Sequence, residues 1–419
     1  MTASTADLPL RERISPRGWT IVLISLIGIS TGPAAFGIAS LGLFIEVFEK
    51  QFGWNRAEVS SAASLMMLCS AFSMPVVGRL VDKIGPRKVL IPSVAILGLC
   101  FLAIPAFVTQ FWQFMLVYVA IGTIAAGTNS VPYMRVLASW FDRSRGLAIG
   151  IAGSGTGLGF AYVPLVGQAA ISQFGWQAGY VALGLIMLCV TLPLVLFFLK
   201  ERPDGATEAE GAAAEGQGGM NLKEVLRTRN FYLLAAIFVT LAFVLYGLIP
   251  HMVPLLTDRG VSPAAAAGVA SIFGFATFAG RIAIGFLVDK FDARLIAVTF
   301  FAISAVGLGL LAVPMPTWAM IVPALLLGGS LGAEVDMLAY LTSRYFGLKC
   351  FAQVFGALFG AVLVAMGLGP VAFGVVFDLT GSYGSMLAVG APACLAAAGL
   401  MLLLPPVLER RRGAAVSVT

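Results

Sequence analysis

Twelve apolar runs, each long enough to cross a lipid bilayer, constrain this chain more than any other feature of its sequence. A soluble protein carries about 25% charged residues, whereas this chain has 11% and is 59% hydrophobic. It therefore lacks the polar surface that a water-facing fold needs, and we predict an all-α, polytopic membrane protein. The runs cover residues 19–46, 57–80, 88–108, 111–138, 146–171, 177–200, 231–257, 264–288, 294–314, 317–341, 352–378 and 385–406.

A polar segment separates the first six runs from the last six. Residues 201–230 are rich in Gly, Ala and Glu and also contain Asp and Gln, a composition typical of a flexible linker. We expect a six-helix bundle in residues 1–200, a cytoplasmic linker in 201–230 and a second six-helix bundle in 231–419. The run beginning at Trp19 is too long for a signal-peptide core, so we interpret it as the first spanning helix.

The distribution of Lys and Arg predicts the orientation in the membrane. If both termini and the linker are cytoplasmic, 21 of the 26 basic residues lie on the cytoplasmic side. Three lie outside (Lys50, Arg56 and Arg259) and two lie within spans (Arg135 and Arg281). This asymmetry follows the positive-inside rule and predicts a multi-pass protein of the cell (inner) membrane. It also explains the net charge of +6 without a nucleic acid partner.

An internal repeat relates the two halves. Residues 78–87 read G-R-L-V-D-K-I-G-P-R, and residues 285–294 read G-F-L-V-D-K-F-D-A-R, at an offset of 207. Each loop follows the second span of its half, so the halves have the same orientation, which is one known transporter design. We expect the loops to form a cytoplasmic gate that latches the halves, although they could simply be charged loops that fix orientation. The residues of this gate are Gly78, Asp82, Arg87, Gly285, Asp289 and Arg294.

These loops resemble the signature of the major facilitator superfamily, G-x-x-x-D-R/K-x-G-x-R/K. The second copy departs from it at Asp292, which stands where the pattern has glycine. Within the superfamily the chain is similar to the monocarboxylate transporters, particularly bacterial ones. The passages that carry this similarity are F-G-W-N-R-A-E-V-S at 52–60, R-G-L-A-I-G-I-A-G-S-G-T-G at 145–157, R-I-A-I-G at 281–285 and G-P-V-A-F-G-V-V-F-D-L-T-G-S-Y at 369–383.

Two positions differ from the animal members of that family. Ala39 stands where they carry a lysine that helps to bind the anion, and Thr277 stands where they carry an aspartate. The resemblance therefore implies anion binding by Arg281, but proton coupling cannot be carried over from those members.

Ionisable residues inside the spans are the principal site candidates, because a charge in mid-bilayer costs at least about 2.5–3.5 kcal/mol. Arg281 presents a planar guanidinium that matches a carboxylate, so we expect it to bind substrate. A structural arginine paired with an acid is the alternative. Glu334 and Asp336 point about 200° apart on a helix. We favour Asp336 as the partner of Arg281 and expect Glu334 to pack toward another helix, and either carboxyl could carry a proton.

Five further residues complete the candidate set. Asn129 and Tyr133, four apart on the fourth predicted span, could bind a polar ligand or join helices. Arg135 could contact substrate or extend to the cytoplasmic surface. Tyr340 shares a face with Asp336, and we include it among the substrate-binding residues. His251, the single histidine, is a candidate for proton coupling or a buried structural group.

The sequence contains no nucleophile–base pair, metal cluster or nucleotide-binding loop, so we expect neither an enzyme nor a cofactor or metal. Gly153, Gly155, Gly157 and Gly159 favour close helix packing. The five cysteines are scattered singly.

We therefore predict a secondary transporter, expected to act as a monomer, that moves an organic monocarboxylate with a proton by alternating access. An anion exchanger of the oxalate/formate type, a proton-driven drug efflux carrier and a membrane sensor remain alternatives.

Overall fold

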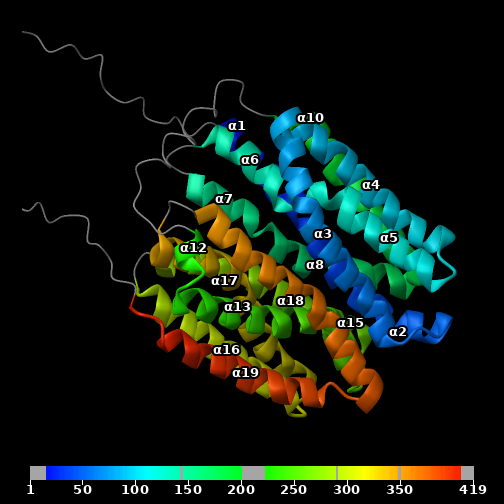
Figure 1. Ribbon diagram of the computed structural model, residues 1–419. Coiled ribbons are helices and arrows are strands. Elements are labelled where there is room, and N and C mark those ends of the chain that lie inside the picture. Colours follow the sequence, from blue (N-terminus) through cyan, green and yellow to red (C-terminus); the bar gives the residue numbers. More distant parts are fainter. Residues whose placement is uncertain (1–15, 142–144, 201–221, 289–290, 348–350, 407–419) are drawn as a thin grey trace, which may run out of the picture.

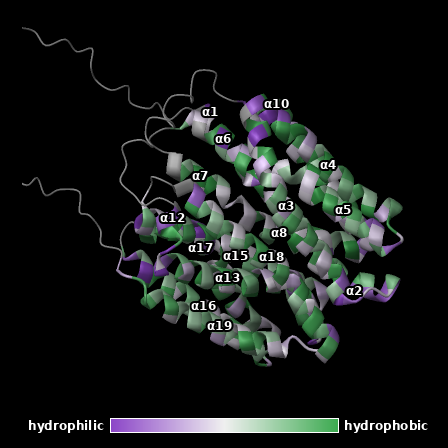
Figure 2. Ribbon diagram, viewed as in Figure 1, coloured by the Kyte–Doolittle hydropathy of each residue, from purple (hydrophilic) through white to green (hydrophobic). Residues whose placement is uncertain are grey.

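Long apolar helices run side by side through the molecule (Figure 1). The structure is a computed structural model that describes residues 16–141, 145–200, 222–288, 291–347 and 351–406. Within these residues, twelve helical segments are long and apolar enough to cross a membrane. Hydrophilic residues gather toward the ends of the helices (Figure 2), as expected for a protein whose middle lies in lipid. The predicted all-α fold in two six-helix bundles is confirmed.

The first bundle contains α1 (Pro16–Ser30), η2 (Ala34–Ala39), α2 (Leu41–Phe52), α3 (Arg56–Ile84), α4 (Pro86–Phe107), α5 (Phe111–Thr123), η3 (Ile124–Thr128), α6 (Ser130–Trp140), α7 (Arg145–Gly153), α8 (Gly155–Phe174), α9 (Trp176–Ile186), η4 (Met187–Thr191) and α10 (Leu192–Phe197). The second contains α13 (Arg229–Leu248), η5 (Ile249–His251), α14 (Met252–Thr257), α15 (Pro263–Val288), α16 (Ala293–Ala312), η6 (Thr317–Met320), α17 (Ile321–Phe346), α18 (Phe351–Thr380) and α19 (Gly384–Leu402).

Several spans that the sequence predicts as continuous helices are interrupted. The first contains the π-helical segment η2 directly after Pro33, and the seventh contains the 3₁₀ segment η5, which includes Pro250. Proline lacks the backbone N–H of a regular helix, which explains these two breaks. The fourth span breaks at Asn129, whose backbone is extended. We expected Asn129 and Tyr133 to lie one turn apart on a single helix. The break at Asn129 shows that they do not.

The predicted linker is partly helical. Residues 201–221 lie outside the described residues, but a short helix, α12 (Leu222–Val225), follows them, and Val225 is fully buried. The next span already begins at Arg229, where the Thr228 hydroxyl accepts a hydrogen bond from the N–H of Phe231. The seventh span therefore begins at Arg229 and not at residue 231, because the Thr228 side chain caps the helix at that point.

The two ends of the bundle differ in charge, and we name them accordingly. The basic end carries Arg87, Arg294 and Arg344, and the acidic end carries Glu46, Glu49, Asp258 and Asp378. The halves meet along two helix pairs, α3 with α18 and α8 with α15.

Three glycines on α18 show how the distance between α18 and α3 changes from the acidic end to the basic end. Gly374, Gly367 and Gly360 are seven residues apart and therefore share one face. A Cβ on Gly374 would lie 2.7 Å from Ala57, and one on Gly367 would lie 3.3 Å from Ser64. At Gly360, nearer the basic end, nothing lies within 4 Å. The two helices thus separate toward the basic end.

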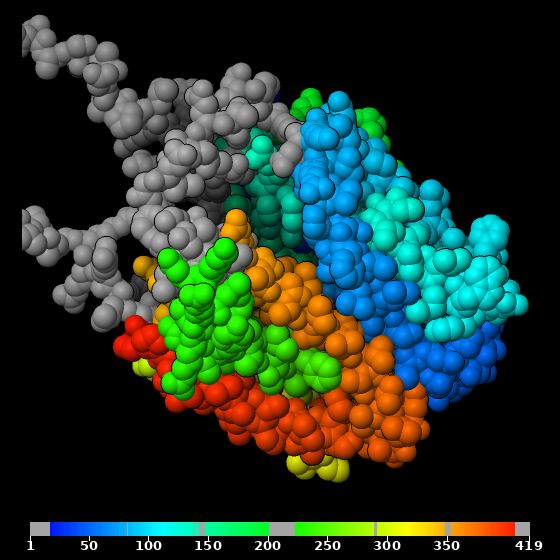
Figure 3. Space-filling view, in the orientation of Figure 1, coloured from blue at the N-terminus to red at the C-terminus, as the bar shows by residue number. Residues whose placement is uncertain are grey.

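The second helix pair shows the same divergence. A Cβ on Gly157 of α8 would lie 2.4 Å from the backbone of Phe278, whereas one on Gly153 of α7 would meet the Arg281 side chain at 3.5 Å. At Gly150, closer still to the basic end, nothing lies within 4 Å. The surface is hollowed between the two halves near this end (Figure 3). In the part of the chain that the structure describes, the two halves are therefore closed at the acidic end and open at the basic end.

We expect Gly274→Ala on α15 to destabilise the protein, because the new Cβ would lie 2.2 Å from the backbone of Ala161 and Phe160. Overpacking of this kind costs about 1–3 kcal/mol. Thermal unfolding in detergent should show a lower Tm for this variant. Gly268→Ala on the same helix is the matched control, because nothing lies within 4 Å of that position. Equal Tm values for the two variants would contradict the close approach of α8 and α15.

Candidate substrate site and acidic-end closure

Arg281 on α15 forms a two-pronged ion pair with Asp336 on α17. The Nε of Arg281 donates to Oδ2 of Asp336 at 2.9 Å, and Nη2 donates to Oδ1 at 3.1 Å. The Arg281 side chain is 22% exposed and that of Asp336 is 41% exposed, so the pair borders open space. This is the pairing that we expected from the sequence. Because the Arg281 side chain is partly exposed, a second carboxylate can approach its guanidinium while the pair with Asp336 is present.

The third contact of Arg281 crosses between the halves. Its Nη1 donates to the backbone carbonyl of Gly153 at 2.9 Å. Gly153 is the last residue of α7, where the helix breaks at Ser154 before α8 begins. Because the carbonyls at a helix end lack intrahelical partners, this one is available to Arg281. Met134 lies beside the same glycine and adds an apolar wall that we did not predict from the sequence.

Glu334 is only 2% exposed. Neither of its carboxyl oxygens has a hydrogen-bond partner among the described residues. It interacts electrostatically with Tyr246 of α13 and Cys394 of α19, so it faces the interior of the second half. Tyr246 also interacts with Arg281 and Asp336.

The remaining substrate-site candidates make other contacts. Tyr133 is fully buried against Gly28 of α1, within the first half. The amide of Asn129 donates to the carbonyl of Ala126 at 3.0 Å and completes a turn. Arg135 is half-buried on α6. The hydroxyl of Tyr340 accepts from Arg344 at 2.9 Å. No described contact joins these four residues to Arg281.

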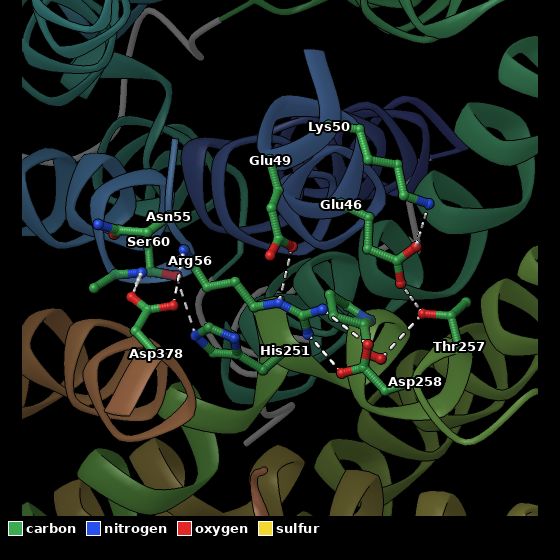
Figure 4. Close-up of polar contacts among 12 residues, drawn as sticks. Glu46, Glu49, Lys50, Asn55, Arg56, Ser60, His251, Thr257, Asp258 and Asp378 are labelled. Carbon is green, nitrogen blue, oxygen red and sulfur yellow. Dashed lines mark hydrogen bonds and ion pairs between the residues drawn. The ribbon is translucent and has the colours of Figure 1, made fainter. Parts of the chain in front are cut away.

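At the acidic end, Arg56 connects the two halves (Figure 4). Its guanidinium, on α3, donates to both carboxylate oxygens of Asp258 at 2.6 Å and 2.8 Å, and to the Tyr383 hydroxyl at 3.0 Å. Within its own half it also pairs with Glu49 at 3.3 Å. The carbon between its three nitrogens lies 3.7 Å from the centre of the Phe377 ring. The Arg56 side chain is only 5% exposed, so these contacts replace its hydration.

Two further contacts strengthen this closure. Asp378 of α18 accepts hydrogen bonds from the backbone N–H groups of Arg56 and Ala57, at 3.2 Å and 2.8 Å. A carboxylate there complements the positive end of the α3 helix dipole. The Thr257 hydroxyl donates to Glu46 of α2. We call the set Glu46, Glu49, Arg56, Thr257, Asp258, Asp378 and Tyr383 the acidic-end closure.

His251 is fully buried beneath this closure. Its Nδ1 lies 2.9 Å from the Tyr383 hydroxyl, and its Nε2 lies 2.9 Å from the Pro370 carbonyl and 3.1 Å from the Ser60 hydroxyl. The imidazole stacks on Phe373 at an interplanar angle of 19°. It therefore joins α3, η5 and α18 and does not lie at the Arg281 site.

The predicted gate residues bind within their own halves in this structure. Arg87 donates to the carbonyl of Leu196 at the end of α10, and Arg294 donates to that of Leu404, just after α19, at 3.0 Å. Trp140 and Tyr345 make an equivalent pair of contacts, to the carbonyls of Lys200 and Pro405 at 2.7 Å and 2.8 Å. These pairs follow the internal repeat.

The other gate residues make no inter-half contact that the structure describes. A Cβ added at Gly78 or Gly285 would meet no described atom of another element within 4 Å. The Asp82 side chain and Asp289 lie outside the described residues.

Sequence reasoning assigned Arg56 only to the outer loops and did not identify the acidic-end closure. Its local signal is the F-G-W-N-R-A-E segment, where Asn55 and Glu58 form a reciprocal cap at the start of α3. Its partners lie 202 and 322 residues away, at Asp258 and Asp378, and no local pattern connects them.

Comparison with known proteins defines the class. A model of the Major Facilitator Superfamily matches residues 27–370 and 243–417, so the chain belongs to this superfamily. It is a membrane transporter and not an enzyme. A crystal structure of a bacterial homolog to human lysosomal transporter Spinster, in an inward-facing and unoccupied conformation, has the same fold. Its TM-score is 0.65 at 17% identity, covering 93% of this chain and 95% of that one.

Relatives by sequence include several transporters. The chain is 26% identical to the uncharacterized MFS-type transporter YcxA of Bacillus subtilis (strain 168), over 96% of this chain and 98% of that protein. It is 27% identical to monocarboxylate transporter 13 of Rattus norvegicus, over 93% of this chain and 89% of that protein. It is 25% identical to monocarboxylate transporter 1 of Rattus norvegicus, over 94% of this chain and 78% of that protein.

Proposed function

We propose that this chain moves an organic monocarboxylate across the membrane together with a proton, by alternating access. The observation that carries this proposal is the partly exposed guanidinium of Arg281, which lies where the two halves separate toward the basic end. A guanidinium binds a carboxylate through two parallel hydrogen bonds. Its position between the halves suits a site exposed alternately to the two sides. The monocarboxylate transporters among the relatives favour the same substrate class.

The Arg281–Asp336 pair suggests how proton movement follows from anion binding. A substrate carboxylate at Arg281 would place two carboxylates beside one cation. Like charges in one site cannot both remain ionised cheaply, so one carboxylate takes a proton. Asp336 is the more accessible candidate, because its side chain is 41% exposed, whereas Glu334 is 2% exposed. The loaded site then has the same net charge as the empty one, and transport is electroneutral.

The distribution of basic residues sets the proposed orientation. We place the basic end and both termini in the cytoplasm, in the cell (inner) membrane, because basic loops favour that side. The structure then represents a state open to the cytoplasm. Arg281, Asp336 and Gly153 all belong to one chain, so we expect a monomer to be sufficient for transport.

Uptake into proteoliposomes tests the proposal. We expect an inside-alkaline pH gradient to drive accumulation of at least one member of a panel of radiolabelled monocarboxylates. Asp336→Asn should abolish accumulation driven by the gradient, because its neutral side chain cannot exchange a proton. Glu334→Gln is the comparison variant, and we expect it to retain gradient-driven uptake.

Other outcomes would assign a different function. Uptake that requires an internal counter-anion and ignores the pH gradient would favour an anion exchanger of the oxalate/formate type. Absence of carboxylate movement in the wild type, combined with proton-driven export of an organic cation, would favour drug efflux.

A further inference from the structure

The hydrogen bonds around His251 allow only one arrangement of hydrogens when its ring is neutral. The Pro370 carbonyl can only accept, so Nε2 carries the hydrogen and Nδ1 is the acceptor. The Tyr383 hydroxyl therefore donates to Nδ1, and its oxygen accepts from Arg56. Burial raises the pKa of the Tyr383 hydroxyl, which keeps it protonated and able to donate. Arg56, Tyr383, His251 and Pro370 thus form one continuous chain of hydrogen bonds.

A proton on His251 breaks this chain. Both ring nitrogens would then donate, so the Tyr383 hydroxyl would have to turn its hydrogen away from Nδ1 and accept from both Nδ1 and Arg56. The imidazolium would also lie one hydroxyl group away from the Arg56 guanidinium, and the two cations repel. Separation of the halves would let water solvate both cations. The closed arrangement accordingly favours neutral His251, and the open arrangement tolerates its charged form.

The other charged groups near His251 contact Arg56 and not the imidazole. On α2 and α3, Glu49 and Arg56 pair with one another. From the second half, Asp258 follows α14 and Asp378 lies near the end of α18, and both contact Arg56. No described carboxylate contacts the imidazole itself, and its ring stacks on Phe373. An imidazolium there would therefore have no anion to pair with.

We propose that His251 is a second proton-binding site of this transporter, and that its protonation opens the acidic-end closure. A ligand shifts a conformational equilibrium toward the state that binds it more tightly, and here the ligand is a proton. This site is separate from Asp336, where we place the transported proton. Opening of the acidic-end closure can be measured without substrate. This proposal therefore depends on the proposed transport function only for its physiological role.

The experiment measures the distance between the halves at the acidic end in lipid nanodiscs. Spin labels are attached at Gln51→Cys on α2 and Ser385→Cys on α19, both exposed positions, after replacement of the five native cysteines. Between about pH 8 and about pH 5.5, the range in which histidine titrates, we expect the open population to rise several-fold. A label pair at Lys88→Cys and Leu295→Cys, exposed at the basic end, should report the opposite movement.

Variants connect the response to His251. His251→Gln, which cannot take up a proton in this range, should stay closed at both pH values. Tyr383→Phe removes the hydroxyl between Arg56 and the imidazole, so its pH response should be smaller than that of the wild type.

Any one of the following outcomes would overturn the proposal. The wild type does not respond to pH; His251→Gln responds like the wild type or is open at both pH values; or Tyr383→Phe has an unchanged response. A response that persists in His251→Gln but disappears in Asp258→Asn would also overturn it and would assign the pH dependence to the carboxylate. None of these results depends on which substrate is carried.

Discussion

Replacement of Arg281 by alanine is expected to reduce monocarboxylate uptake at subsaturating concentration by about 30-fold or more. Loss of one partner from a hydrogen-bonded charge pair costs about 2–5 kcal/mol, and the lower value already corresponds to roughly 30-fold in binding. We use the lower value because the Asp336 side chain is 41% exposed, so water compensates part of the loss. Initial uptake rates in proteoliposomes, corrected for the amount of reconstituted protein, measure the effect.

Further variants separate recognition of the anion from general damage. Arg281→Lys keeps the charge but not the planar fork, so we expect it to recover only part of the uptake. The double variant Arg281→Ala with Asp336→Asn removes both charges from the membrane and should restore folding but not uptake. Arg344→Ala is the matched control, because that arginine lies on α17 at the exposed basic end. Normal carboxylate uptake by Arg281→Ala would show that the assigned anion site is wrong.

Replacement of Arg56 by glutamine is expected to open the acidic end. The change leaves Asp258 and Glu49 facing each other without the cation between them. Their side chains are 32% and 43% exposed, so solvent reduces the cost to about 2 kcal/mol. That is enough to shift the equilibrium between closed and open states by roughly 30-fold. We expect the labels at positions 51 and 385 to report a larger mean distance, and net uptake to fall because the closed state is less populated.

A neighbouring ion pair provides the control for Arg56. Lys50 lies 3.8 Å from Glu46 within α2, and its side chain is 80% exposed. Exposed pairs contribute about 0–1 kcal/mol, so Lys50→Gln should leave the distance unchanged. The charge reversal Arg56→Asp with Asp258→Arg should restore part of the closed population if the contact between these two residues holds the halves together. An unchanged distance in Arg56→Gln would mean that the helix packing alone keeps the acidic end closed.

The sequence predicted most of the fold because the membrane makes local information sufficient. Each span must satisfy its own backbone hydrogen bonds in lipid, so a long apolar run is almost necessarily a helix. The interruptions at Pro33 and Pro250 have a local cause that the sequence also contains. The break at Asn129 also has a local cause, because Pro132 in the first turn of α6 lacks the N–H that a continuous helix would need.

The candidate site was predicted in part. Arg281 and Asp336 stood out because charged residues are rare in spans. Glu334 and Asp336 lie on opposite faces of one predicted helix, so we expected only one of them, Asp336, to pair with Arg281. Tyr133 is also a polar residue within a predicted span, as a ligand-binding residue would be. It nevertheless packs against Gly28 inside the first half. Which face of a helix points toward the other half depends on helix rotation, and a uniformly apolar helix gives no pattern from which to read it.

By itself, the sequence determined that this protein is a set of apolar helices in two repeated halves, with two guanidinium and two carboxyl groups within the predicted spans. Only the tertiary structure decided which end is closed and what closes it. Arg56, His251 and Asp378 are separated by 195 and 127 residues in the chain, yet they meet at one end of the molecule. The physical reason is that closure depends on pairing between the halves. That pairing forms when two complete bundles dock, and neither bundle encodes it locally.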